Sequence, residues 1–600
     1  MIGRARRAGG FWRPVLHGWL LLVFLLPAGC RTPGSGVSTS ITLLHTNDTH
    51  SHLESFTPFG EPEQGGVARR QTLIRAVRAD KGDDRVLLVD AGDFFQGTVF
   101  YNAWKGSADI MALNDMGYDA ATLGNHEFDS GPEELGRALR GAPVVIDHAS
   151  LATEPLIVPL VAANLDVSGE AALAGLIRPS IVVRKGGVEI GIVGVITETA
   201  GRISDLGPRV VVREYAASVQ AEVERLRRRG IDRIVLLSHA GYAVDKRLAP
   251  QLAGVDIIVS GHDHPLLLPP AAYAPSAPLA VLADRVVGEY PTVTAGRDGA
   301  PVLIVGAYEW GGFLGRLDVT FDRGGVLSAW RGAPLFVDGS VVPEPRLAER
   351  VASYKAPIAA FAAAPIGRAA VFFDGGAQPG LRTGEMPLGN LVADAVLAVA
   401  AGRDKAVAAL INGGGLRAGL PVSGLLPGAP PPYQVTFGDA LTVLPFGNSI
   451  VTMDVTGRQL VAALDNGLGW AFDQAAGASR ASGAFPQVAG LRATYCADRV
   501  ADMHRDVARP ASCAAALLVG GVVTDLRVAD RPVDLEATYR LATSDYLAGG
   551  GDYYDSLAEA CNRAEGYCLK TGLLMLDALV AQFADHAPVA RPAAGRLLAR

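Results

Sequence analysis

Five short clusters of aspartate, asparagine and histidine give this chain the side chains for binding metal ions. Each cluster follows a short apolar run of the kind that forms a buried strand. The clusters are Thr46–His50, Asp90–Asp93, Gly124–Asp129, Ser238–His239 and Ser260–His264. Nitrogen ligands combined with carboxylates suit zinc, manganese or iron better than calcium or magnesium. The pattern therefore predicts a metal centre assembled from five separated loops.

Seven side chains in these clusters are enough to hold two divalent ions. We assign one ion to Asp48, His50 and His264, the second to Asn125, His239 and His262, and a bridging role to Asp93. Two ions about 3.5–4 Å apart bind phosphate oxygens and turn a coordinated water into hydroxide near neutral pH. We therefore expect attack of a metal-bound hydroxide on phosphorus, with no covalent enzyme intermediate.

One histidine in the third cluster is not needed as a ligand. His126 follows Asn125 and can stabilise the transferring phosphoryl group or protonate the leaving oxygen. Asp129, three residues later, can orient its imidazole. His52 and His148 are interpreted as loop residues. A lone histidine is more often a surface or core residue than a ligand, so the interpretation depends on all five clusters arriving in order.

The elements that must position these side chains alternate between strand and helix. Strands are predicted at Ile41–His45, Val86–Val89, Ala120–Leu123, Ile234–Leu237 and Val255–Val259. Helical spacing lies between them, as in Val67–Arg78 and Ala216–Arg229. Ligands in α/β sheets gather at the carboxyl ends of strands. The first half is therefore predicted to be a layered α/β domain with its site at one sheet edge.

The second half, from about residue 365 to 600, is predicted to be α+β. A helix over Pro345–Ala363, which Pro357 can kink, is expected to join the two halves. Further helices are predicted at Leu391–Ala401, Gly457–Leu468 and Thr571–Phe583, and a strand at Ala406–Ile411. Residues 266–295 are rich in proline and alanine and are expected to form an extra loop.

The N-terminus has the pattern of an export signal. Four arginines and no acid precede an apolar run from Val15 to Leu26, which is too short to span a bilayer. Small residues then precede Cys30, as in the lipobox of bacterial lipoproteins. We expect a signal peptide over 1–29, a lipid anchor at Cys30, a spacer over 30–40, and a periplasmic or cell-surface location. The alternatives are a plain secretory signal or an uncleaved anchor.

Composition and cysteine placement agree with an exported globular protein. The 600 residues are 49% hydrophobic and 19% charged, which excludes intrinsic disorder, and the net charge of −7 excludes a nucleic-acid polymer as the expected partner. Four late cysteines lack the spacing of a zinc site and are expected to form two disulfides. Of three connectivities, the sequential one closes short loops and is favoured, namely Cys496–Cys513 and Cys561–Cys568.

Four segments of the first half resemble a known family. LLHTNDTH, LLVDAGDFFQGT, LGNHEFD and VSGHDHP resemble the exported 5'-nucleotidases and UDP-sugar hydrolases among the calcineurin-like metallophosphoesterases. The resemblance implies a four-layer β-sandwich flanked by helices, with metal ligands and a His–Asp dyad on the residues named above. Similar 2',3'-cyclic phosphodiesterases often carry Asn where this chain has Asp129. The resemblance therefore favours a phosphomonoesterase over a cyclic phosphodiesterase.

Four segments of the second half resemble the nucleotide-recognition motifs of the same family. They are RTGEMPLGN, NGGGLR, VLPFG and YLAGGGD, beginning at residues 382, 412, 443 and 546. The resemblance implies that the rings of Phe446 and Tyr546 hold the base between them and that Asn412 contacts the edge of the base. It also implies that Asp552 accepts from the ribose hydroxyls, and that Arg382 and Arg417 supply positive charge for the ribose and phosphate. Tyr546 departs from the usual Phe and adds a hydroxyl that needs a partner.

Together these patterns predict a phosphoesterase domain over 41–340, a linker helix over 341–364 and a nucleotide-binding domain over 365–600. The expected reaction is hydrolysis of nucleoside 5'-monophosphates, with UDP-sugars or other nucleotides as further substrates. The alternatives are a 2',3'-cyclic nucleotide phosphodiesterase, a UDP-sugar pyrophosphohydrolase, or a nucleotide-binding lipoprotein receptor without turnover. No oligomeric state follows from the sequence.

Overall fold

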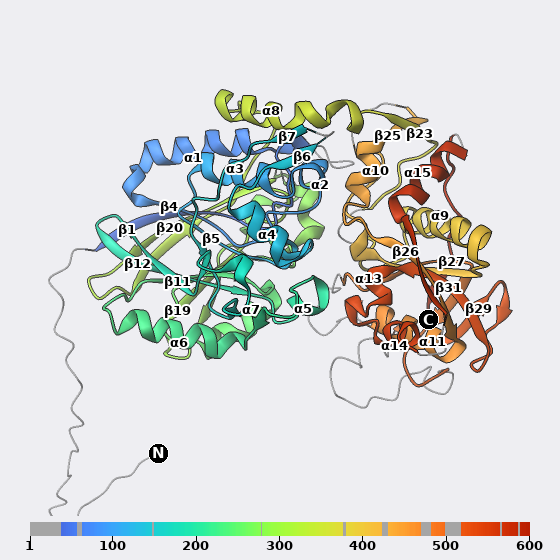
Figure 1. The fold of residues 1–600 in the computed structure, drawn as a ribbon. Coiled ribbons are helices and arrows are strands. Elements are labelled where there is room, and N and C mark those ends of the chain that lie inside the picture. Colours follow the sequence, from blue (N-terminus) through green and yellow to red (C-terminus); the bar gives the residue numbers. More distant parts are fainter. Residues whose placement is uncertain are drawn as a thin grey trace, which may run out of the picture.

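The computed structural model describes residues 38–600 except for 57–62, 147–148, 278, 376–379, 423–429, 470–481, 498–517, 564–566 and 586–587. These residues form two α/β domains that lie side by side, and helix α8 (Pro345–Ala362) runs along one side of the molecule between them (Figure 1). The expected signal peptide, the Cys30 anchor and His148 lie outside the described residues.

Two mixed sheets form the first domain, and the five predicted strands lie within them. The eight-stranded sheet has the order β10-β8-β5-β4-β1-β20-β21, with β22 paired to β20. In this sheet β10 is Ile177–Arg178, β8 Leu160–Val161, β20 Phe313–Phe321, β21 Leu327–Gly332 and β22 Leu335–Phe336. The six-stranded sheet has the order β11-β12-β14-β15-β19-β18, in which β11 is Ser180–Lys185, β12 Val188–Ile196, β19 Pro301–Val305 and β18 Thr292–Ala295. The strands that precede the clusters are β1 (Thr39–Thr46), β4 (Val86–Asp90), β5 (Ala120–Thr122), β14 (Ile234–His239) and β15 (Ile257–Ser260). Within each sheet these strands are parallel to their neighbours in this set, so their carboxyl ends share one edge.

Alternate residues of the first sheet enter two different cores. Leu43 and Leu87 pack between the two sheets, whereas Leu44 and Leu88 pack on the outer face. The outer face is covered by α1 (Val67–Lys81), α3 (Ser107–Met116), α4 (Gly131–Leu139) and α8, and the second sheet by α6 (Tyr215–Arg227) and α7 (Tyr242–Leu248). The domain thus has the four layers that the resemblance implies.

The expectation of an extra loop over 266–295 is wrong. This segment contains β16 (Leu266–Leu267), β17 (Val286–Gly288) and β18 (Thr292–Ala295), and β18 pairs with β19 (Pro301–Val305) at the edge of the second sheet. Leu266, Leu268 and Leu282 pack with Phe313 in a small core of their own. The strands are only two to four residues long, so the sequence of strand-forming residues is too short to be recognised among the surrounding prolines and alanines.

The second domain is built around a five-stranded sheet with apolar cores on both faces. Its order is β27-β24-β31-β26-β32, formed by Pro486–Ala489, Ala408–Asn412, Thr538–Ser544, Ser449–Thr456 and Cys568–Leu574. One core includes α9 (Pro387–Asp404), α10 (Phe437–Val443) and α15 (Met575–Asp585), and the other includes α11 (Gly457–Gly469) and α14 (Asp555–Cys561). A four-stranded sheet, β30-β29-β28-β33, completes the domain and is formed by Arg531–Pro532, Val523–Val528, Leu491–Tyr495 and Leu597–Ala599.

Two predictions for this domain have different outcomes. The predicted helix over Thr571–Phe583 starts too early, because residues up to Leu574 belong to β32 and pair with β26. This pairing joins residues more than a hundred positions apart, and a local pattern does not contain it. Cys561 and Cys568 form the predicted disulfide. The pairing Cys496–Cys513 lies outside the described residues, because Cys513 does.

Helix α8 packs on the first domain through the face predicted for it. Leu347, Val351 and Ile358 are buried in the outer core of that domain, and the helix continues through Pro357. Trp104 Nε1 donates to the Tyr354 carbonyl at 2.8 Å.

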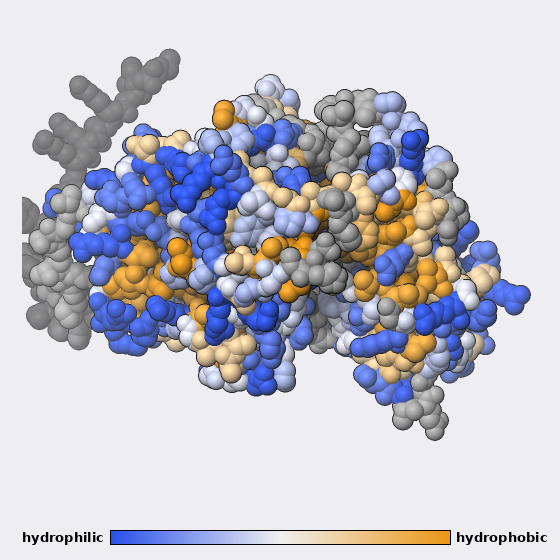
Figure 2. Space-filling model, turned by 45° about the horizontal axis from the view of Figure 1, so that its top comes forward, coloured by the Kyte–Doolittle hydropathy of each residue, from blue (hydrophilic) through white to orange (hydrophobic). Residues whose placement is uncertain are grey.

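The face in Figure 2 mixes hydrophilic and hydrophobic residues over both domains. Among the described residues, every helix is too short or too polar to cross a bilayer.

Candidate metal centre and substrate pocket

The ligand side chains predicted from the five clusters come together at the carboxyl ends of the strands. Three groups have ligand atoms within 4.8 Å of one another: Asp48 with His50 and His264, Asp93 with His239 and His262, and His50 with Asp93 and His126. Asp93 belongs to two groups, which is the arrangement expected of a bridging carboxylate. Six of the seven residues assigned as ligands therefore lie together, with His126 beside them, and Asn125 lines the same pocket.

The backbone at these positions is strained. Five of the seven proposed ligands have a positive φ, between 46° and 83°, which non-glycine residues rarely adopt. They are Asp48, His50, Asp93, His262 and His264. Such strain costs about 1–3 kcal/mol per residue and concentrates at functional sites. The tight turns after the strands are therefore maintained at the expense of local stability.

Glycine at position 124 is required by close packing inside the cluster. A Cβ there would lie 2.1 Å from Asp93 Oδ1 and 2.6 Å from the His239 ring. Only a residue without a side chain lets the loop that carries Asn125 approach these two ligands.

Two polar atoms in the cluster are buried without hydrogen-bond partners among the described residues. They are Asn125 Oδ1 and His262 Nδ1. His50 Nε2 and His264 Nε2 also lie only 3.2 Å apart. Unpartnered buried polar atoms are costly, and nitrogen atoms that converge in this way suit a shared cation. The residues present therefore fit the divalent ions predicted from the sequence.

Contacts outside the cluster fix the orientation of the histidine rings. His239 Nδ1 donates to the Ala91 carbonyl at 2.8 Å, His50 Nδ1 lies 3.2 Å from the Phe95 carbonyl, and His264 Nδ1 contacts Glu309 Oε2. Such partners fix the tautomer and ring angle of a metal-binding histidine. Glu309 was missed by sequence reasoning because it lies 45 positions from His264 and outside every cluster.

A second carboxylate that sequence reasoning missed supports the backbone of the cluster. Glu127 is buried and accepts from the backbone N–H groups of Asp93, Phe95 and Gly124. It thereby ties the loop after β4 to the loop after β5. Its position inside LGNHEFD, between two residues with assigned roles, was the available signal.

Burial and charge set the protonation states of the cluster. Burial lowers the pKa of His262 to about 3 and, with the Arg417 guanidinium nearby, holds the pKa of His50 well below its usual range. Both imidazoles are therefore neutral, as metal ligands must be. Burial also opposes protonation of His239, but the Asp93 carboxylate at 3.0 Å outweighs it and raises the His239 pKa to about 10. Binding of a cation by this carboxylate and imidazole would therefore release the proton of His239.

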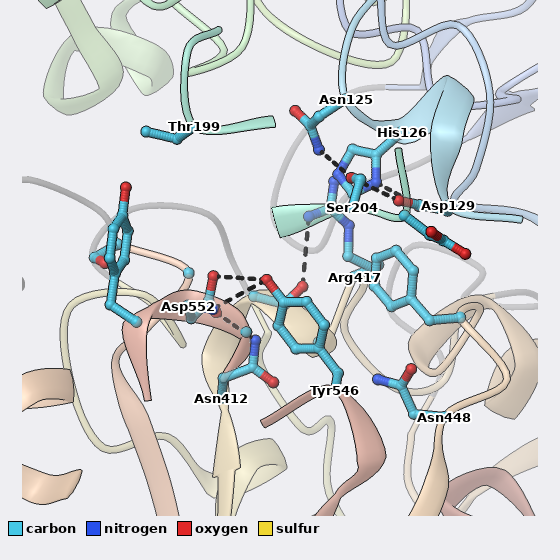
Figure 3. Close-up of a pocket in the computed structure, with 18 of the residues that line it drawn as sticks. Asn125, His126, Asp129, Thr199, Ser204, Asn412, Arg417, Asn448, Tyr546 and Asp552 are labelled. Atoms are coloured by element: carbon cyan, nitrogen blue, oxygen red, sulfur yellow. Dashed lines mark hydrogen bonds and ion pairs between the residues drawn. The ribbon is translucent and has the colours of Figure 1, made fainter. Parts of the chain in front are cut away.

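The proposed His–Asp dyad is formed. His126 Nδ1 lies 2.6 Å from Asp129 Oδ2, and the His126 backbone N–H donates to Asp93 Oδ1 at 2.9 Å. Asp129 Oδ1 accepts from Ser204 Oγ at 2.9 Å (Figure 3). The imidazole is therefore held beside the ligand cluster, with the Asp129 carboxylate on its Nδ1 side.

The predicted nucleotide-binding residues of the second domain contact one another. The Tyr546 hydroxyl donates to Asp552 Oδ1 at 3.1 Å and accepts from the Asp552 backbone N–H at 3.2 Å. Asn412 Nδ2 donates to Asp552 Oδ2 at 2.7 Å (Figure 3). The hydroxyl that Tyr546 adds thus has the partner it needs, and that partner is the proposed ribose acceptor.

Two residues of the second domain reach the metal-ligand cluster of the first. Arg417 Nη2 lies 3.2 Å from His50 Nε2, and the Phe446 ring stacks on His126 with centroids 5.5 Å apart. Both domains line one cavity of about 830 Å³, which includes Asp93, Asn125, His126, Asp129, His262 and His264 from the first and Arg382, Asn412, Arg417, Phe446, Tyr546 and Asp552 from the second. The two sets of predicted residues therefore share one pocket.

His52 lies in the loop after β1, where it was interpreted as a loop residue. Its ring stacks on Trp310 at 4.8 Å, and its Nδ1 donates to the His50 carbonyl at 2.8 Å. It supports the loop that carries two proposed ligands.

Comparison with known proteins assigns both domains. Residues 41–266 match the calcineurin-like phosphoesterase model, and residues 365–559 match the 5'-nucleotidase C-terminal domain model. The first match ends two residues after His264. Fold and site thus define a phosphoesterase domain, of a fold that implies divalent metal ions, joined to a 5'-nucleotidase C-terminal domain.

Relatives that match most of this chain agree with this assignment. The chain is 30% identical to a snake venom 5'-nucleotidase of Naja atra over 88% of its own length and 94% of that protein. It is 31% identical, over 87% of its length, to the trifunctional nucleotide phosphoesterase protein YfkN of Bacillus subtilis, of which it spans about a third. The crystal structure of a 5'-nucleotidase precursor from Thermus thermophilus has 36% identity and a TM-score of 0.79, and the match covers 93% of this chain and 99% of that one. The chain belongs to the 5'-nucleotidase family and is a phosphoric ester hydrolase.

Proposed function

We propose that this protein hydrolyses nucleoside 5'-monophosphates to nucleoside and phosphate. The observation that carries the proposal is the single cavity lined by the metal-ligand cluster of one domain and the nucleotide-recognition residues of the other. A nucleotide held by its base and ribose in the second domain would direct its phosphate towards the cluster. The names of the relatives support the same substrate class.

Two divalent ions, zinc, manganese or iron, are proposed for the cluster. Asp48, His50 and His264 would hold one, Asn125, His239 and His262 the other, and Asp93 both. When bound, such ions supply Lewis acidity and lower the pKa of a coordinated water towards neutrality. This is the chemistry that hydrolysis of an unactivated phosphate ester needs.

The chain's own residues would position the substrate and move the proton. Arg382 and Arg417 supply positive charge for the ribose and phosphate side, and Phe446 and Tyr546 supply flat faces for the base. His126 has Nδ1 bonded to Asp129, which leaves Nε2 to donate a proton to the departing 5'-oxygen. Neutralising that oxygen favours cleavage of its bond to phosphorus.

One assay tests the substrate class. Phosphate release is measured with AMP, UDP-glucose, 2',3'-cyclic AMP and a plain phosphodiester, after chelation and again with Mn²⁺ or Zn²⁺ restored. We expect AMP to be the best substrate and activity to return only with metal. Preference for a cyclic nucleotide or a UDP-sugar would assign one of the alternative reactions. No turnover of any substrate with metal present would favour a nucleotide-binding receptor.

We also propose export, a lipid anchor at Cys30, and division of the chain at 41–340, 341–364 and 365–600. The Cys561–Cys568 disulfide supports an oxidising location, and one relative is named for venom, which is a secreted fluid. Labelling of cells with a radioactive fatty acid tests the anchor, because Cys30→Ser should abolish incorporation. Incorporation into Cys30→Ser would contradict it.

A further inference from the structure

Ser204 lies between a proposed metal ligand and the proposed dyad, yet it belongs to none of the five clusters. It follows the short helix α5 (Ala200–Ile203), is half-buried, and lines the shared cavity. Figure 3 shows it between Asn125 and Asp129, joined to each by a dashed line. Asn125 Nδ2 lies 3.3 Å from Ser204 Oγ, and Ser204 Oγ lies 2.9 Å from Asp129 Oδ1.

The direction of these two hydrogen bonds is fixed by chemistry. An amide Nδ2 can only donate, and an ionised carboxylate can only accept. The Ser204 hydroxyl must therefore accept from Asn125 and donate to Asp129. A serine or threonine hydroxyl is the side-chain group of this size that does both at once.

The first bond orients the amide of Asn125. Because Nδ2 is held by Ser204, Oδ1 is turned the other way, and Oδ1 is the atom that is buried without a partner among the described residues. An amide binds a metal ion through oxygen and not through nitrogen. Ser204 thus selects the amide orientation in which Asn125 can serve as a ligand.

The second bond orients the carboxylate of Asp129. The Ser204 proton occupies Oδ1, so Oδ2 is the oxygen that accepts from His126 Nδ1 at 2.6 Å. With Nδ1 protonated, Nε2 of His126 is the atom that exchanges a proton with substrate. One hydroxyl therefore links the orientation of a metal ligand to the orientation of the dyad.

We propose that Ser204 is a positioning residue that sets the metal-binding orientation of Asn125 and the orientation of the His126–Asp129 dyad together. The statement about the dyad rests on the proposed function, whereas the statement about Asn125 rests only on metal binding. If Ser204 served only a structural role, such as ending α5, its loss would not selectively change either metal binding by Asn125 or the action of the dyad.

The test uses the full chain with three substitutions. Ser204→Ala removes the hydroxyl, Ser204→Thr keeps it, and Ser353→Ala removes an exposed hydroxyl on α8 that donates to the Arg350 carbonyl of the same helix. Thermal unfolding first checks that all three are folded. Mn²⁺ affinity of the chelated proteins is then measured by titration calorimetry, and kcat is measured with AMP and with p-nitrophenyl phosphate.

We expect Ser204→Ala to weaken Mn²⁺ binding about 10-fold, as the loss of a group that supports a ligand does. Its kcat should fall more with AMP than with p-nitrophenyl phosphate, because p-nitrophenolate leaves without being protonated. Ser204→Thr should restore both, and Ser353→Ala should match the wild type. Unchanged Mn²⁺ affinity in Ser204→Ala, or equal losses on the two substrates, or no recovery in Ser204→Thr, would overturn the inference. If wild type hydrolyses neither ester, the proposed function fails, while the Mn²⁺ titration still decides whether Ser204 orients Asn125.

Discussion

The two ends of the shared pocket differ in how their polar atoms are satisfied. At the phosphate end, Asn125 Oδ1 and His262 Nδ1 are buried without hydrogen-bond partners among the described residues. At the nucleoside end, Asn412, Tyr546 and Asp552 bond to one another. The first end therefore needs a bound cation to be complete, whereas the second is already complete and presents a preformed surface to its ligand.

The difference extends to the backbone. Five ligands at the phosphate end have a positive φ, and Glu127 and Glu309 maintain the loops and rings around them. At the nucleoside end the groups are positioned mainly by side-chain contacts, with Asp552, at φ 51°, fixed by its neighbours. Substitutions at the first end should therefore abolish metal binding and reaction together, and substitutions at the second should mainly change affinity and selectivity.

Loss of Asp93 should have the largest effect. Asp93 belongs to two of the three ligand groups, so Asp93→Ala removes a ligand from both proposed ions. We expect phosphate release to fall on the order of 10⁴-fold or more, because the activated water depends on those ions. Metal content by mass spectrometry should fall in parallel, while Asp525→Asn, at a half-exposed strand position, should change neither. Full metal content in Asp93→Ala would remove the basis for a bridging role.

Loss of the dyad should leave the metal centre intact. His126→Gln removes the proposed proton donor but leaves all seven proposed metal ligands in place. We therefore expect kcat for AMP to fall by about 10²–10³-fold. Metal content should stay at the wild-type value. Phe446 stacks on His126, so KM should be compared as well, and a large rise in KM with constant kcat would assign His126 to binding instead.

Much of the phosphate end could be predicted from sequence because its signals are local. A short apolar run followed at once by Asp48 or His239 predicts both a strand and a ligand at its end. Ser204 and Glu309 gave no such signal, because each acquires its role only when the fold brings it beside a distant loop. The same reason explains β32, where pairing with the distant strand β26 overrides local composition. The strands of segment 266–295 were missed because they are only two to four residues long.

The nucleoside end was less predictable for a related reason. The motif at residues 546–552 indicated an aromatic ring and an acceptor, and the tyrosine hydroxyl was expected to need a partner. That the partner is Asp552 depends on the turn through Gly551 and on the positive φ of Asp552, which no residue pattern specified.

Removing the Tyr546 ring should weaken nucleotide binding without loss of metal. A base stacked on an aromatic side chain gains about 1–3 kcal/mol, so Tyr546→Ala should raise the Kd for AMP by roughly 5- to 150-fold. Equilibrium binding to the metal-loaded protein measures the change. Loss of metal in this variant would show that the two ends of the pocket are not separate in function.

Removing only the Tyr546 hydroxyl should have the smallest effect and separates stacking from ribose recognition. Tyr546→Phe keeps the ring but removes the group that donates to Asp552 Oδ1 and accepts from its backbone N–H, which leaves the carboxylate held by Asn412. A hydrogen bond of this kind contributes about 0.5–1.5 kcal/mol, so kcat/KM for AMP should fall roughly 2- to 10-fold.

If Asp552 accepts from the ribose hydroxyls, Tyr546→Phe should hardly change kcat/KM for 2',3'-dideoxy-AMP, because this substrate has no ribose hydroxyl that could donate to Asp552. The ratio of kcat/KM for the two substrates is therefore the measurement. An equal fall on both would mean that the Tyr546 hydroxyl stabilises the loop and not the contact with ribose. The preformed character of the nucleoside end would then reflect stability and not selectivity.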